Sequence, residues 1–306
     1  MPKTLIAAAA LAAWPCVAPA QPAAQPAAAA GGPRIYISAD MEGIAGVVTQ
    51  EQLGPTGFDY RDARELMTGE VLAAIQGARE AGAGEIVVSD SHGNMQNLLL
   101  ERLPKDVTIV RGTPRPLSMM EGIDSGFAGV IFVGYHAGTT SADGVRAHTF
   151  SSATLADVRL GGATVNEGVW NAAVAGHFGV PVLAVTGDEA AVKEVAAQVA
   201  GIEQVIVKWP AGFHSARTLT PPAARDRIQA AVRRAVERRS ERKAYSVRVP
   251  LDVELRFKNY RPAEVLSWLP GITRADAHSV RFRARDMVEA TRFVAFALNY
   301  PPSLEP

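Results

Sequence analysis

Residues 34–43 read RIYISADMEG, and this stretch sets the pattern from which both the fold and the site can be predicted. Its first half, Arg34 to Ser38, is a short β-prone run, and two carboxylates follow it two positions apart. Side chains two residues apart in an extended segment point to the same side, so Asp40 and Glu42 are placed to share a cation. An Asp directly after a strand could also cap a turn or the next helix.

Strand-like and helix-like segments alternate after this stretch. Apolar residues at helical spacing predict a helix over 61–81, and residues 85–89 form the next β-prone run. Further strands are expected at 107–111, 129–134 and 182–186, and further helices at 167–178 and 189–199. The alternation predicts an α/β fold with a mainly parallel sheet and helices on both faces.

Two regions depart from this alternation. Alternating residues over 151–160, a turn at Gly161-Gly162 and the resumed run Thr164-Val165 predict a hairpin before the helix at 167. Beyond residue 221 we expect a charged helix at 223–239, strands at 246–257 and 278–284, a short helix at 263–268 and a closing helix at 286–298. The expected organisation is an α/β metal-binding catalytic domain over 33–220 and a smaller C-terminal α+β unit over 221–306.

Polar side chains that can bind metal stand where the apolar runs end. They are Asp40 and Glu42, Asp90-Ser91-His92, His136, the loop residue His148, Asn166-Glu167 at a helix start, and Asp188. In an open α/β sheet the carboxyl ends of neighbouring strands face one crevice, so residues far apart in sequence can meet there. The spacing therefore predicts an enzyme site built around metal.

Each of these residues also has an ordinary structural explanation. Asp90 could accept the second ring proton of His92 or form a turn. Glu167 could interact with the helix dipole, and His148 could be a plain loop residue. His136 follows a strongly apolar run, where a structural histidine would need a specific partner. Three other histidines lack comparable placement and are expected to be structural or exposed: His177, His214 and His278.

The composition excludes several kinds of partner. The chain has 306 residues, of which 48% are hydrophobic, and its 31 basic and 31 acidic residues cancel. No basic cluster is interleaved with aromatic residues, so no nucleic acid or anionic membrane surface is expected as a partner. A small, mostly neutral substrate is compatible with this balance.

The N-terminal 20 residues have the pattern of a secretory signal peptide. Lys3 supplies the positive start, residues 5–13 the apolar core, and Ala18-Pro19-Ala20 the cleavage site. A membrane anchor is the alternative, but the apolar core is too short and prolines interrupt it, so we expect no stable membrane insertion after cleavage. The expected product is exported, periplasmic or secreted, with residues 21–32 forming a disordered tether.

Cleavage after Ala20 would remove Cys16, the chain's one cysteine. Residues 13–15 lack the leucine and small residues of a lipoprotein signal, so lipid attachment at Cys16 is not expected. The mature chain would then have no disulfide and no thiolate, which leaves oxygen and imidazole as metal ligands.

Five segments together resemble peptidase family M55, the D-aminopeptidases. They are residues 40–46 (DMEGIAG), Asp90-Ser91-His92, residues 134–137 (GYHA), the loop His148 and Asn166-Glu167-Gly168. Their order and spacing are those of the family. The similarity runs from Ile35 to about Asn299 and includes Lys208 and the segment 284–287.

This resemblance implies a zinc aminopeptidase with two Zn²⁺ ions per subunit, acting on short peptides with N-terminal D-amino acids such as D-Ala. By the family's pattern Asp40 bridges the metals, and Glu42, His92, His136 and Glu167 complete their ligand shells. His148 matches the family's catalytic histidine. It could attack the carbonyl directly, or it could carry protons and stabilise the oxyanion. The family also implies a ring-forming homo-oligomer.

Two other functions are compatible with the same residues. One is a dinuclear metallohydrolase acting on another amide or on a phosphate ester, although neither a glycine-rich phosphate loop nor a cluster of arginines stands beside the ligand segments. The other is an exported metal- or solute-binding protein. A binding protein has no need of His148, which favours catalysis.

Overall fold

The structure is a computed structural model, and it describes residues 31–300. The predicted signal peptide, 1–20, and nearly all of the predicted tether, 21–32, lie outside the described residues. Within residues 31–300 no helix combines the length and the apolar character needed to cross a bilayer.

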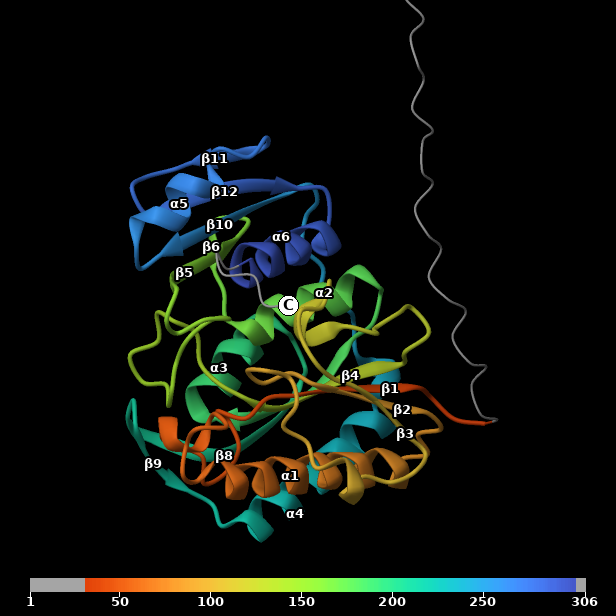
Figure 1. Ribbon diagram of the computed structural model, residues 1–306. Helices are drawn as coiled ribbons and strands as arrows, with labels where there is room; N and C mark the ends of the chain where they lie inside the picture. Colours follow the sequence, from red (N-terminus) through yellow and green to blue (C-terminus); the bar gives the residue numbers. More distant parts are fainter. Residues whose placement is uncertain (1–30, 301–306) are drawn as a thin grey trace, which may run out of the picture.

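A seven-stranded sheet forms the centre of the molecule (Figure 1). Its strands, in spatial order, are β3 (Val107–Val110), β2 (Ile86–Asp90), β1 (Ile35–Ala39), β4 (Gly129–Tyr135), β7 (Val182–Asp188), β8 (Glu203–Gly212) and β9 (Ser215–Thr218). All neighbours are parallel except β9, which pairs antiparallel with β8. The predicted α/β class with a mainly parallel sheet is confirmed.

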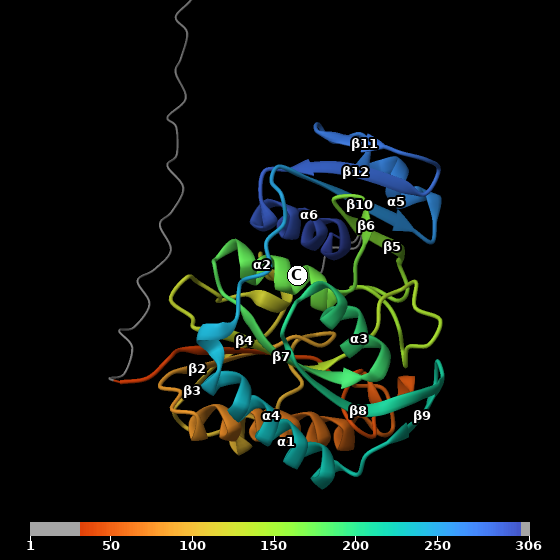
Figure 2. The same cartoon turned by 180° about the vertical axis from the view of Figure 1, so that it is seen from behind.

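Helices cover both faces of this sheet, as the views from the front and from behind show (Figures 1 and 2). The helices are α1 (Tyr60–Glu80) and α4 (Pro221–Glu237) on one face, and α2 (Glu167–His177) and α3 (Glu189–Gln198) on the other. Strand β1 supplies both cores by alternation: Ile35 and Ile37 pack in the core of α1 and α4, and Tyr36 packs in the core of α2. A strand buried on both faces is expected to be mainly apolar, and β1 is, apart from Ser38, whose hydroxyl is hydrogen-bonded.

A smaller antiparallel sheet lies beyond α2. Its spatial order is β11 (Ile272–Arg274), β12 (Ser279–Ala284), β10 (Leu251–Phe257), β5 (Leu155–Leu160) and β6 (Ala163–Thr164), and it is accompanied by α5 (Tyr260–Leu266) and α6 (Met287–Asn299). The predicted hairpin before α2 is confirmed as β5 and β6, and β5 pairs with β10. This sheet therefore takes strands from both sides of residue 220, while α4 packs on α1 in the larger layer.

Strands β8, β9 and β11 were not predicted, and β10 begins at Leu251 rather than at residue 246. The order β3-β2-β1-β4 has a functional consequence. The chain builds outward from β1 through β2 to β3, and then returns to the other side of β1 with β4. A crevice opens at such a reversal, at the carboxyl ends of the strands.

Candidate metal centre

The carboxyl ends of three neighbouring strands supply the first four predicted ligands. Asp40 and Glu42 follow β1, His92 follows β2, and His136 follows β4 directly. Glu167 is the first residue of α2, and His148 lies in the loop between β4 and β5. All six line one cavity of about 360 Å³, so the structure brings every predicted ligand together with the predicted catalytic histidine.

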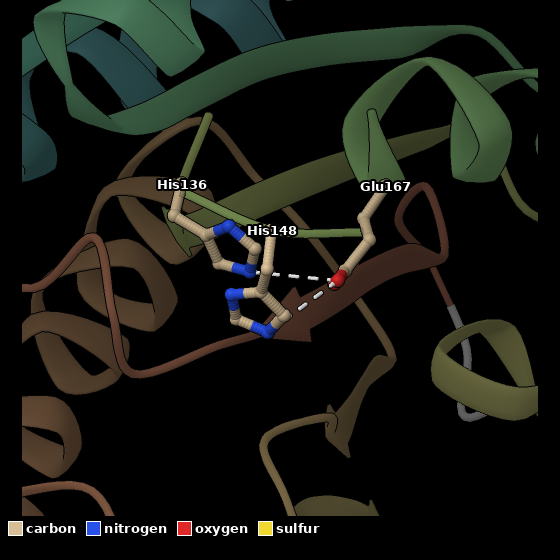
Figure 3. Close-up of side chains that lie close together, drawn as sticks. All are labelled: His136, His148 and Glu167. Atoms are coloured by element: carbon tan, nitrogen blue, oxygen red, sulfur yellow. Dashed lines mark ion pairs between the residues drawn. The ribbon is translucent and has the colours of Figure 1, made fainter. Parts of the chain in front are cut away.

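Three carboxylates and three imidazoles lie within ion-pair distance in this cavity. His92 Nδ1 is 2.8 Å from Glu42 Oε2 and 3.4 Å from Asp40 Oδ1. His136 Nε2 is 3.3 Å from Asp40 Oδ2 and 3.5 Å from Glu167 Oε1. His148 Nε2 is 3.9 Å from Glu167 Oε1 and 4.0 Å from Glu42 Oε1. Figure 3 shows His136 and His148 beside one another and facing Glu167.

Backbone carbonyls fix the orientation of all three imidazole rings. His92 Nε2 lies 2.8 Å from the carbonyl of Leu53, and His136 Nδ1 lies 3.0 Å from that of Ala137. His148 Nδ1 lies 2.8 Å from the carbonyl of Arg146. A carbonyl only accepts, so each of these nitrogens carries the proton in a neutral ring. The other nitrogen of each ring then turns an unprotonated lone pair towards the carboxylates, as a metal ligand or a proton acceptor requires.

Burial and mutual attraction shift the pKa values of the cluster. Burial lowers the pKa of His92 and His136, but the surrounding carboxylates outweigh it and raise both well above the ordinary value. Burial raises the pKa of Glu42 and Glu167, but the facing imidazoles hold both below their usual range. For Asp40, burial and the Glu42 charge together raise the pKa. Without a cation the cluster therefore keeps protons on histidines to balance its carboxylates.

The cluster has the properties of a site for a divalent cation. Asp40 Oδ2 is buried and has no hydrogen-bond partner among the described residues, although it faces His136. Two groups with ligand atoms within 4.8 Å of one another share His136: one adds Asp40 and Glu42, and the other adds His148 and Glu167. Mixed imidazole and carboxylate ligands suit zinc. The residues present therefore fit the metal that the resemblance implies.

The remaining predicted polar residues support the cluster from outside. Asp90 accepts from the backbone N–H groups of Asn97 and Leu98, and not from His92, so it is the turn former of the two alternatives. Asn166 caps α2 by accepting from the N–H of Val169, which sets the start of the helix at Glu167. Asp188 caps α3 in the same way. None of His177, His214 and His278 lines the cavity.

A buried lysine holds the loop that carries Glu42. Lys208 on β8 is fully buried, and its Nζ donates to the backbone carbonyls of Glu42, Ile44 and Val47. Burial lowers its pKa to about 8. Residue-type patterns do not predict this role, because a lysine in the middle of a strand is expected at a solvated edge.

Two buried arginines also line the cavity, although no cluster of arginines stands beside the ligand segments in the sequence. Arg115 comes from the loop after β3, and Arg146 lies two residues before His148. Each is only 8% exposed. The sequence position of Arg146 next to a candidate catalytic residue was a usable signal. Arg115 lies more than 20 residues from any ligand in the sequence, and only the fold brings it near.

Known proteins resemble this chain in sequence and in structure. Residues 34–296 match the family described as peptidase M55, D-aminopeptidase. A D-aminopeptidase of Bacillus subtilis (strain 168) is 32% identical over 261 residues, covering 84% of this chain and 93% of that protein. The solved structure of the Zn-dependent D-aminopeptidase DppA from Bacillus subtilis, a self-compartmentalizing protease, matches with a TM-score of 0.83 and 30% identity, covering 87% of this chain and 98% of that one.

Proposed function

The chain belongs to the peptidase M55 family of D-aminopeptidases and is a metallo-aminopeptidase, and from that premise we propose that it releases N-terminal D-amino acids from short peptides at a centre of two zinc ions. The observation that carries the proposal is the orientation of His92, His136 and His148. Each ring donates one proton to a backbone carbonyl and turns its other nitrogen towards the carboxylates.

Five residues would hold the metal: Asp40, Glu42, His92, His136 and Glu167. Support for two ions comes from two clusters of side chains that share His136, one with Asp40 and Glu42 and the other with Glu167 and the adjacent His148. When bound, zinc supplies Lewis acidity that polarises the scissile carbonyl and makes water easier to deprotonate. Histidine must be unprotonated to bind it, so the ring protons that balance the carboxylates have to leave when the metal enters.

We assign proton transfer to His148. Its Nδ1 donates to the carbonyl of Arg146, so its Nε2 is the free acceptor and faces Glu42 and Glu167. The side chain is 14% exposed, compared with 2% for His136, and it lines the cavity. Nε2 can thus accept the proton of the attacking water and return it to the leaving amine. Direct attack by His148 is the second mechanism, and an acyl-histidine captured by rapid quench and mass spectrometry would establish it.

A requirement for the free amine of the substrate would explain why the enzyme cleaves only after the N-terminal residue. An ammonium group entering a cavity with three buried carboxylates is attracted to them, and as an amine it could also approach a metal. N-acetylation removes both interactions. D-Ala-D-Ala blocked with an acetyl group should not be cleaved, and turnover equal to that of the free peptide would contradict this assignment.

The main test compares stereoisomers and a catalytic variant. The protein from Gln21 onward, saturated with zinc, should release alanine from D-Ala-D-Ala and not from L-Ala-L-Ala. Replacement of His148 with Ala should retain zinc, measured by elemental analysis, and lose most of the turnover. Equal release from both isomers would contradict D-specificity. Release from neither, with zinc bound, would favour another amide substrate or an exported binding protein.

Export and assembly complete the proposal. Residues 1–20 have the composition of a cleaved signal peptide, which would place the enzyme in the periplasm or outside the cell. The relative described as a self-compartmentalizing protease supports a ring of subunits. Native mass spectrometry of protein expressed from the full sequence measures both. A subunit beginning at Gln21 in a closed oligomer is expected, whereas a full-length monomer would contradict both proposals.

A further inference from the structure

Arg115 is a buried cation in the wall of the catalytic cavity. It lies in the loop between β3 and β4 and is 8% exposed. Its Nη2 donates to the carbonyl of Asp90 at 3.0 Å, and its Nη1 donates to that of Val110 at 3.3 Å. Its Nε is buried and has no hydrogen-bond partner among residues 31–300. The guanidinium is therefore anchored by two neutral carbonyls and keeps several donors unused.

No carboxylate neutralises this charge. Among the described residues Arg115 forms no ion pair, and the Asp90 carboxylate beside it is occupied by the N–H groups of Asn97 and Leu98. Burial lowers the pKa of Arg115, and Tyr36, Asp90 and Glu121 offset only part of this shift. A buried charge without a partner is costly, and an anionic ligand that enters the cavity would relieve that cost.

The anchor of Arg115 lies beside the metal ligands. The register of the sheet pairs Asp90 of β2 with Ala39 of β1, and Ala39 directly precedes Asp40. The carbonyl that holds Arg115 also comes two residues before His92. One residue of extended peptide spans about 3.5 Å, so a peptide with its N-terminal residue at the metal ligands could present a nearby carboxylate to Arg115.

We propose that Arg115 binds the free α-carboxylate of the substrate, so that the enzyme prefers very short peptides, dipeptides above all. This assignment rests on the proposed aminopeptidase function and names its substrate class. A guanidinium can bind a carboxylate through two parallel N–H donors, which fixes its direction as well as its position. The scissile bond is then held between the metal ligands at one end and Arg115 at the other.

Arg146 is the competing cation in the same cavity. Its Nη2 donates to Gln50 Oε1, its Nη1 lies 3.3 Å from His214 Nδ1, and its guanidinium lies over the ring of Phe213. The contacts with Phe213 and His214 tie it to the turn between β8 and β9, where both of these residues are exposed. We therefore assign Arg146 to holding the loop that precedes His148, and it serves as the comparison for Arg115.

The test compares substrates with and without a C-terminal carboxylate, in enzymes with and without the charge of Arg115. D-Ala-D-Ala and its C-terminal amide share the scissile bond and the free amine, and only the first carries a carboxylate. The wild-type zinc enzyme should prefer the acid in kcat/KM. Replacement of Arg115 with Gln should lower kcat/KM for the acid on the order of 10- to 100-fold, mainly through KM, and change that for the amide by less than about threefold.

Two further variants separate this role from a structural one. Arg115→Lys keeps the charge and should regain part of the preference for the acid, and Arg146→Gln should leave the ratio of acid to amide unchanged. An equal loss on both substrates in Arg115→Gln would show that Arg115 only holds the loop. If Arg146→Gln instead abolished the preference for the acid over the amide, Arg146 would be the residue that binds the carboxylate. Cleavage of p-nitrophenyl phosphate that depends on Arg115 would assign it to phosphate.

Binding without turnover gives an independent readout. In zinc-loaded His148→Ala protein, calorimetry should show tighter binding of D-Ala-D-Ala than of its amide, and Arg115→Gln should abolish the difference. Absence of cleavage of any D-peptide by the wild type would count against the proposed function. Equal Kd values for acid and amide would count against Arg115.

Discussion

Glu70 is a buried carboxylate whose charge the fold disfavours. It lies on α1, is 1% exposed, and accepts from the N–H of Ala45 in the loop that Lys208 also holds. Its second oxygen has no hydrogen-bond partner among the described residues. Burial raises its pKa from 4.5 to about 7, although Ala45, Lys208 and Arg225 oppose the shift. Near neutral pH the side chain changes its protonation state inside the protein.

The stability of the protein should therefore fall as Glu70 ionises. A carboxyl group with a raised pKa binds its proton more tightly in the folded state, so its contribution is complete below pH 4.5 and is lost as pH rises through about 7. The shift corresponds to about 3 kcal/mol. Glu70→Gln cannot ionise. Between pH 4.5 and 7.5 the unfolding free energy of the wild type should therefore fall further than that of the variant, by up to about 3 kcal/mol.

Urea unfolding of both proteins at the two pH values measures this difference. Glu101→Gln, which removes an exposed carboxylate, is the control and should follow the wild type. Parallel pH profiles for the wild type and Glu70→Gln would show that folding does not raise the pKa of Glu70.

That the five predicted metal ligands would line one cavity could be inferred from residue types, because each stands at a strand end or a helix start. Asp40 follows β1 and His136 follows β4, and both strands are mainly apolar because they are buried on both faces. Arg115 could not be predicted in this way, since its loop reaches the cavity by a path that depends on packing. Asp90 could have been the partner of His92 or a turn former, and the sequence is compatible with both interpretations. Only the positions of Asn97 and Leu98 decide between them.

At the level of elements, the contact between β4 and β7 places His136. Tyr135, the last residue of β4, pairs with Gly187 near the end of β7. A Cβ atom on Gly187 would lie 1.9 Å from the carbonyl oxygen of Tyr135, a distance that neither strand can accept without moving. The absence of a side chain at this position thus lets the end of β4 approach β7.

Gly187→Ala should displace the strand end that carries His136. We expect a loss of about 1–3 kcal/mol in unfolding free energy, as for other overpacked sites. We also expect zinc affinity to fall by about tenfold or more, because a ligand is moved. Chemical denaturation and competition with a zinc chelator measure the two effects. Gly54→Ala, where a Cβ would meet nothing within 4 Å, should change neither. Unaltered zinc affinity in Gly187→Ala would show that His136 is placed by other contacts.

Two neighbouring strands, β8 and β9, could not be predicted from the sequence. In β8 the apolar alternation is broken by Lys208 and Pro210, so the segment does not read as a buried strand. Lys208 is nevertheless fully buried because three carbonyls of the Glu42 loop satisfy its ammonium group. Strand β9 is short, polar and mostly exposed at the edge of the sheet, and it has no pattern to read.

At the level of the whole molecule, the cavity lies between the two sheets. One wall is the crevice at the carboxyl ends of β1, β2 and β4, and the other is α6, which contributes Thr291, Val294, Ala295, Leu298 and Asn299. A hydrogen bond from Trp170 Nε1 on α2 to Thr291 Oγ1 on α6 ties the walls together. The smaller sheet and its helix therefore shape the room available to a substrate.

Ala295→Phe should narrow this room without disturbing the metal ligands. Ala295 is half-buried and lines the cavity, so a phenyl ring there would occupy part of the 360 Å³. We expect kcat/KM for D-Leu-D-Leu to fall about tenfold more than that for D-Ala-D-Ala, since the larger side chains need the space. Ala295→Ser, which adds a single oxygen, should keep the ratio. Equal effects on both peptides would place the substrate away from α6.

The α/β class follows from the alternation of strands and helices along the chain, but the pairing of strands in the smaller sheet does not. Strand β5 belongs to the hairpin before α2, yet it pairs with β10, which begins at Leu251. No local pattern identifies a partner so distant in sequence, because strand pairing is decided by which apolar faces remain to be covered. The smaller sheet accordingly takes β5 and β6 from before residue 220, and β10, β11 and β12 from after it.

The spread of the ligands over β1, β2, β4 and α2 means that a bound cation would act as a cross-link. It would join segments that are far apart along the chain and restrict the unfolded state much as a disulfide does. The described residues contain no cysteine that could do this covalently. Removal of the metal would then loosen the edge of the sheet as well as stop catalysis. Resistance to proteases would depend on metal supply, in the way that resistance of many secreted proteins depends on oxidised thiols.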